Sequence, residues 1–161
     1  MEFMTQVIFI GLVATLVIDM WAVILRKTFK FPTTNWDMVG RWCAHLPSGK
    51  FIHRPISDSK PVRYEQTIGW LFHYIIGIAY ACSYLMLMAY VVKSEPSLSS
   101  AIIFGVVTLI APWLVLQPAL GLGLFARLAE KPTTIRAINL SVHLIFGAVL
   151  YFGWAVSLIL V

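Results

Sequence analysis

Four long runs of apolar residues dominate the chain, and within each run the apolar residues are continuous. The runs cover residues 3–25, 68–92, 98–125 and 137–160. At 1.5 Å per residue, each is long enough to cross about 30 Å of hydrocarbon as an α-helix. A strand of a transmembrane β-barrel would instead show about ten residues of strict polar and apolar alternation. The pattern therefore predicts an all-α, polytopic membrane protein with four transmembrane helices in a single domain, residues 1–161.

The connection between the first two runs, residues 26–67, is the one long polar segment. Within it, Asn35 offers an N-cap to a short stretch from Trp36 to Leu46 that has one apolar stripe and one polar stripe at helical spacing. This stretch is predicted to be an amphipathic helix, which either lies in the membrane interface or folds over the mouth of the bundle. In the third run, Pro112 and Pro118 remove backbone donors and are expected to kink that helix.

Composition excludes a water-soluble globule, because 60% of the residues are hydrophobic, only 12% are charged and the mean hydropathy is +0.84. The basic residues are placed very unevenly. Eleven of the 12 Lys and Arg residues lie in the connections 26–67 and 127–136, and Lys93 alone lies in the turn between the second and third runs. The positive-inside rule assigns the two basic connections to the cytoplasm and both termini to the outside. The net charge of +5 is then a topology signal, compatible with contacts to anionic lipid headgroups, and requires no nucleic-acid partner.

Each of the four runs carries one strongly polar side chain near its cytoplasmic end. Asp19, His73 and His143 each lie seven residues, or about 10 Å, inside that end, and Gln117 lies slightly deeper. Small residues share the helix stripe of each polar group, as close helix packing requires. We therefore expect a polar layer that faces the interior of the bundle.

Several interpretations of this layer remain open. It is either a set of interhelical hydrogen bonds that only holds the helices together, or a binding site. Asp19, His73 and His143 form a suitable ligand set for a divalent metal. A haem between the two histidines is less favoured, because no further motif supports it. A lipid, a quinone or a small anionic ligand entering from the cytoplasmic leaflet is the remaining candidate. No catalytic residue stands out, so an enzymatic reaction is neither assigned nor excluded.

The cytoplasmic connection has its own candidate residues. If the amphipathic helix folds over the bundle, Arg41, His45 and His53 are expected to close the cavity that the polar layer lines. Arg41 would then neutralise Asp19 or hold an anionic ligand. The full expected binding set is Asp19, Arg41, His45, His53, His73, Gln117 and His143.

The sequence also hints at an internal duplication. The segment from Gly11 to Trp21 resembles the segment from Gly105 to Trp113, and His73-Tyr74-Ile75-Ile76-Gly77 resembles His143-Leu144-Ile145-Phe146-Gly147. A real repeat predicts two parallel helical hairpins with a potential site at their interface. The Gly121-Leu122-Gly123 stretch would serve either a homo-oligomer contact or close packing within the monomer.

Taken together, these motifs resemble a known family. They are Asp19-Met20-Trp21-Ala22, Gly40-Arg41-Trp42 with His45, Gly49-x-Phe51-x-His53, Gly69-Trp70-x-x-His73-Tyr74-x-x-Gly77, Gln117-Pro118-x-x-Gly121-x-Gly123 and His143-x-x-Phe146-Gly147-x-x-x-Tyr151. Nearly the whole chain is similar to the family called domain of unknown function 2938, which comprises small bacterial inner-membrane proteins. The resemblance implies an inner-membrane location and brings no activity or cofactor with it.

The charge distribution makes a prediction about topology. Reporter domains fused to either terminus are expected to be active only outside the cytoplasm, and a reporter inserted in the connection 26–67 only inside it, because basic connections are retained in the cytoplasm. Paired phosphatase and fluorescent-protein fusions measure both. A cytoplasmic C-terminus would contradict the prediction.

Overall fold

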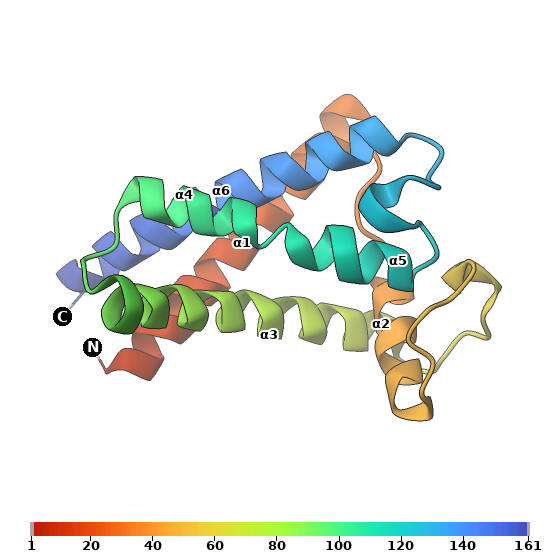
Figure 1. Cartoon of the computed structure of the whole chain (residues 1–161), viewed down its shortest axis with the longest axis horizontal. Coiled ribbons are helices and arrows are strands. Elements are labelled where there is room, and N and C mark those ends of the chain that lie inside the picture. The colour runs from red at the N-terminus through yellow and green to blue at the C-terminus, as the bar shows by residue number, and fades with distance from the viewer. Residues whose placement is uncertain (1, 161) are drawn as a thin grey trace.

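The computed structural model describes residues 2–160, and every regular element in that range is helical. Four long helical segments run through the molecule (Figure 1), and all four are long and apolar enough to cross a membrane. They are α1 (Phe3–Phe29); α3 (Glu65–Met86) with its π-helical continuation η3 (Leu87–Val92); α4 (Leu98–Val107) followed by the π-helical η4 (Ala111–Leu116) and α5 (Gln117–Ala119); and α6 (Pro132–Ile159). The predicted all-α, multi-pass membrane architecture is confirmed.

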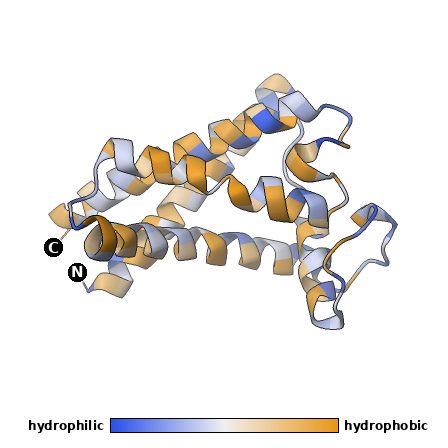
Figure 2. Cartoon of the chain, viewed as in Figure 1, coloured by the Kyte–Doolittle hydropathy of each residue, from blue (hydrophilic) through white to orange (hydrophobic). Residues whose placement is uncertain are grey.

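The two ends of the bundle differ in character. Both termini lie beside the α3–α4 turn at one end, which we call the turn end, whereas the longer connections gather at the other, the loop end (Figure 1). Hydrophilic residues are concentrated in those loop-end connections, while hydrophobic residues cover the long helices (Figure 2). The apolar core occupies the turn-end half, where Ile10, Tyr84, Ala101 and Leu150 are almost completely buried.

Close contacts at glycines join the two helices within each of two helical hairpins. In the hairpin of α1 and α3, a Cβ added to Gly11 would lie 2.5 Å from the Cα of Ile78, next to Gly77. In the hairpin of α4 and α6, a Cβ added to Gly105 would lie 3.0 Å from the Cα of Gly147. These are the glycines that the proposed duplication pairs with one another. The sequence repeat therefore coincides with a repeated mode of packing.

The amphipathic helix α2 (Trp36–His45) packs against the beginning of α3. Asn35 caps it as expected, its side chain accepting hydrogen bonds from the backbone N–H groups of Asp37 and Met38 at 3.0 and 3.3 Å. A Cβ on Gly40 would collide with the carbonyl oxygen of Glu65, so the two backbones are in direct contact. Of the two placements open to α2, the structure has the one in which it folds against the bundle.

The third span is shorter than predicted, ending at Ala119 instead of residue 125. The chain turns there because Gly121 and Gly123 adopt positive φ values of 91° and 70°. The carbonyl groups of Ala119 and Leu120 accept hydrogen bonds from the backbone N–H groups of His53 and Ile56, at 2.9 and 3.1 Å. The other spans begin or end a few residues away from the predicted limits, and α2 ends one residue before the predicted Leu46. Three short turns complete the structure: η1 (Leu46–Ser48), η2 (Ile56–Asp58) and η5 (Leu124–Ala126).

The prolines of the third span lie where its regular α-helix is lost. Pro112 has no N–H to donate to the carbonyl of Thr108, which instead accepts from Ala111 N at 3.1 Å. The helix continues as η4, whose wider turns pull its backbone away from the regular path. The expected distortion is therefore confirmed, and it takes the form of a π-helical segment.

Replacing Gly40 by Ala tests the contact between α2 and α3. The added methyl group must push α2 away from the Glu65 carbonyl, so the free energy of unfolding is expected to fall by about 1–3 kcal/mol. Gly153→Ala is the matched control, because its Cβ would meet Ile10 at an ordinary 3.5 Å. Denaturant unfolding of the purified protein measures both. Equal stability of the two variants would contradict the close packing of α2.

Candidate functional site

A cavity of about 230 Å³ separates the two hairpins in the loop-end half of the bundle. All four long segments contribute to its wall, and Trp36 and Trp42 of α2 cover its end. Both intramembrane histidines, His73 and His143, line it. The cavity therefore lies at the interface between the repeats, where the duplication predicts a site.

The distorted third span accounts for this space. Ala111, Pro112, Val115 and Leu116 of η4 form one wall, and α3 forms the wall opposite. Val115 is 53% exposed although it lines the cavity, so the cavity reaches the outer surface of the bundle beside it. That surface is apolar and belongs to a segment that is long and apolar enough to span a membrane.

On the first hairpin, Asp19 and His73 are joined by a hydrogen bond. Asp19 Oδ1 lies 2.9 Å from His73 Nε2, and Asp19 Oδ2 accepts a hydrogen bond from the Tyr74 hydroxyl at 2.9 Å. The indole of Trp36 packs against the imidazole in a tilted arrangement, with ring centroids 4.0 Å apart. The carboxylate thus fixes the orientation of His73, in the way that an acidic partner orients a catalytic or ligating histidine.

On the second hairpin, His143 has different partners. Its Nδ1 lies 2.8 Å from Thr108 Oγ1 and 3.2 Å from the carbonyl oxygen of Gly105. Since the Thr108 hydroxyl donates to the Gly105 carbonyl at 2.6 Å, the proton between His143 and these two oxygens belongs to Nδ1. The Nε2 of a neutral His143 is then a hydrogen-bond acceptor.

A second cavity, of about 370 Å³, adjoins the first at the loop end. The two share five lining residues: Thr34, Pro112, Leu116, Ile138 and Asn139. Gln117 lines the second cavity and is only 5% exposed, and its Oε1 is buried without a hydrogen-bond partner among residues 2–160. Buried polar atoms of this kind are rare in native structures and call for an explanation.

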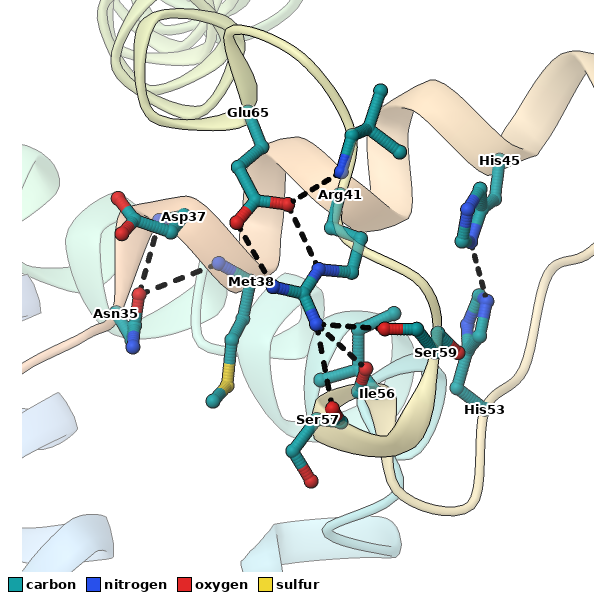
Figure 3. A network of polar contacts seen from close by, with 11 residues as sticks. Asn35, Asp37, Met38, Arg41, His45, His53, Ile56, Ser57, Ser59 and Glu65 are labelled. Carbon is teal, nitrogen blue, oxygen red and sulfur yellow. Dashed lines mark hydrogen bonds and ion pairs between the residues drawn. The ribbon is translucent and has the colours of Figure 1, made fainter.

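Arg41 does not lie near Asp19, contrary to expectation. Its guanidinium forms a two-pronged contact with Glu65, both N···O distances being 2.8 Å, and donates to the carbonyls of Ile56, Ser57 and Ser59 (Figure 3). The hydrogen bond to Glu65 raises the pKa of Arg41 above its ordinary value, against the opposing effect of burial. Arg41 thus joins α2, α3 and the connection into one unit.

His45 and His53 contact each other rather than the cavity. Their imidazoles are joined by a hydrogen bond between His45 Nδ1 and His53 Nε2 at 3.0 Å (Figure 3). Burial, followed by the charges of His53, Lys50 and Arg41, lowers the pKa of His45 below 6.5, which favours its neutral form at pH 7. Neither histidine lines either of the two cavities. The aromatic residues Trp36 and Trp42 therefore cover the end of the first cavity, in place of the predicted Arg41, His45 and His53.

The expected binding set is thus divided among several places. His73 and His143 share one cavity, Asp19 orients His73, and Gln117 belongs to the adjoining cavity. Asp19, His73 and His143 are not assembled into a metal cluster, and no group of three such ligands occurs within residues 2–160. Asp19 and His73 are bonded to each other, whereas His143 Nδ1 is bonded to Thr108 on the second hairpin.

Four residues that matter at these sites were not expected from the sequence as partners. They are Trp36, Glu65, Tyr74 and Thr108. The repeat contained one usable signal, because Thr108 lies three residues after Gly105, on the segment that forms the second hairpin with the His143 helix. Glu65 had no comparable signal, since only the folding of α2 onto α3 brings it to Arg41.

Comparison with known protein families identifies the family to which the chain belongs. The model of the family described as protein of unknown function (DUF2938) matches residues 8–157, and the chain belongs to this family. Searches of curated proteins and of solved structures return no match.

The Arg41–Glu65 contact predicts a stability effect. Arg41→Ala leaves Glu65 and three carbonyls without their donor, so the free energy of unfolding is expected to fall by about 2 kcal/mol. Arg54→Ala, an exposed change in the same connection, is the control and should stay within about 0.5 kcal/mol of the native protein. Denaturant titration measures both. If Arg41→Ala is as stable as the control, the contact does not hold the connection in place.

Proposed function

We propose that this membrane protein binds a small lipid-soluble molecule in the cavity between its two hairpins. The observation that carries the proposal is the cavity itself, a space of about 230 Å³ between two hairpins whose own helices are in close contact at their glycines. Ligand sites in proteins are mostly apolar concavities with a few convergent polar groups. Here the apolar wall contains aromatic residues of α2 and α3, and the polar groups include the two histidines.

The opening beside Val115 supports entry from the membrane. The third span is bent next to it, and α3 lies across from it without a close helix contact of the kind that joins α1 to α3. π-Helical segments within α-helices occur frequently at functional sites. A molecule dissolved in the bilayer would reach the cavity through this side without crossing an aqueous phase.

We also propose that the loop end faces the cytoplasm of a bacterial cell, with the protein in the inner membrane and both termini outside. The uneven placement of the basic residues supports this orientation. Basic residues at the loop end would then contact anionic headgroups of the cytoplasmic leaflet.

One alternative has a specific observation in its favour. Each histidine already makes a hydrogen bond within its own hairpin, His73 to Asp19 and His143 to Thr108. Such interhelical bonds are what a structural or interaction subunit needs, and they require no ligand. The alternative predicts that filling the cavity changes no binding property.

Filling the cavity distinguishes the two functions. Ala111→Phe would place a ring in the space between the hairpins, and its neighbour Ile110→Phe, where the native side chain is 56% exposed, is the matched control. In lipid nanodiscs, the probes dodecan-1-ol, dodecyl phosphate and a naphthoquinone are titrated while the unfolding temperature is recorded. At least one probe is expected to raise it saturably in the native protein and in Ile110→Phe, because a ligand that binds only the folded state stabilises it.

Ala111→Phe should abolish that rise. The baseline unfolding temperatures of the two Phe variants show whether Ala111→Phe still folds. If no probe gives a saturable rise in the native protein, or if Ala111→Phe responds as the control does, the binding function is wrong and the structural alternative is favoured.

A further inference from the structure

We propose that the molecule bound between the hairpins is an uncharged lipid alcohol, whose hydroxyl group binds at Gln117 while its hydrocarbon part occupies the histidine-lined cavity. This inference rests on the proposed function and names the class of its ligand. It joins three observations: the absence of charged residues from the walls, the unpartnered polar atoms at the loop end, and the apolar character of the larger part of the space.

The walls favour a neutral head. Among the residues that the structure describes as lining the two adjoining cavities, there is no Lys, Arg, Asp or Glu. Arg41, the cation expected to hold an anionic ligand, is already engaged by Glu65 and by backbone carbonyls. A phosphate or carboxylate in this space would lose its hydration without gaining a counter-ion, which is strongly unfavourable. A neutral headgroup avoids that loss.

The unpartnered atoms favour a head that donates a hydrogen bond. Gln117 is almost completely buried, and its Oε1 has no donor within residues 2–160. His143, at the wall of the adjoining cavity, has Nδ1 bonded to Thr108 and so presents Nε2 as an acceptor. A buried acceptor without a donor, such as Gln117 Oε1, selects a hydroxyl over a carbonyl or an ether. A hydroxyl also accepts hydrogen bonds, so it suits the Gln117 amide in either orientation of its oxygen and nitrogen.

The rest of the space suits a hydrocarbon chain. Trp42, Phe72, Tyr80 and Phe146 provide its aromatic walls, and the opening beside Val115 leads to the lipid phase. A head at Gln117 would lie near the loop end, at the depth where the bundle turns polar, and the chain would extend through the cavity toward the bilayer. This orientation is the one that an amphipathic molecule already has in a membrane leaflet.

The test compares ligands that carry different headgroups on the same hydrocarbon chain. Native protein in nanodiscs is titrated with dodecan-1-ol, with dodecyl methyl ether, which lacks only the donor, and with dodecyl phosphate. The saturable rise in unfolding temperature gives an apparent Kd for each. Dodecan-1-ol is expected to bind about tenfold more tightly than the ether, because the ether leaves the buried Gln117 Oε1 without a donor. Dodecyl phosphate is expected to bind more weakly than the alcohol.

Gln117→Met keeps the length of the side chain and removes its amide. It should reduce the preference for alcohol over ether to about twofold or less, whereas Gln66→Met, an exposed change at the same end of the bundle, should retain it. Gln117→Asn provides a second variant if Gln117→Met does not fold, with an intermediate preference expected. The comparison of heads on the native protein requires no variant.

The outcomes separate this inference from the proposed function. If the ether binds as tightly as the alcohol, or the phosphate binds tightest, and Ala111→Phe abolishes that binding, then the cavity is a ligand site and the lipid-alcohol inference is wrong. An unchanged preference in Gln117→Met also overturns the inference. If no head gives Ala111→Phe-sensitive binding, the proposed function itself fails.

Discussion

The need to satisfy every backbone polar group inside the membrane determines the shape of the third span, and the site depends on that shape. Lipid offers no hydrogen bonds, so a carbonyl released by a proline must find a partner within the protein. Thr108 carbonyl finds it in Ala111 N, and the helix proceeds as a π-helical segment. At the end of the span, His53 N and Ile56 N supply donors for two further carbonyls. The span is thereby held away from α3, and the cavity lies in the space that remains.

The same constraint explains how the two hairpins use their polar side chains. Each hairpin packs glycine against helix backbone near its middle and places a histidine four residues before the second glycine, His73 before Gly77 and His143 before Gly147. In the first hairpin the partner is a carboxylate, and in the second it is a hydroxyl that is itself anchored to Gly105. The repeat thus keeps the backbone arrangement while the chemistry has diverged. Two imidazoles with different hydrogen-bond partners therefore line one cavity, so its two sides differ chemically.

Much of the fold could be predicted from the sequence, because hydropathy and charge report directly on the solvent of each segment. The four spans, the capped helix beginning at Trp36 and the distortion at the prolines all follow from local patterns. The site was predicted less well. Depth along the helices indicated correctly that Asp19 and His73 could meet, since each lies on a stripe of small residues on its own helix. The depth of a residue along a helix does not specify which neighbour its side chain faces, so it could not predict that His143 contacts Thr108. Arg41 was misplaced because its partner, Glu65, becomes a neighbour only through the tertiary contact between α2 and α3.

The connection 26–67 is best understood as part of the site's framework. Arg41 of α2 contacts Glu65 at the beginning of α3 and also donates to the carbonyls that follow Pro55 (Figure 3). In the same connection, His53 N and Ile56 N hold the end of the third span through backbone hydrogen bonds. A single chain of contacts therefore joins the mouth of the cavity to the helix whose distortion forms its wall. The charged residues of the connection thus stabilise the fold outside the cavities, whose described lining residues include aromatic rings, imidazoles and amides but no Lys, Arg, Asp or Glu. A site built in this way would recognise a molecule by its shape and by the direction of its hydrogen bonds.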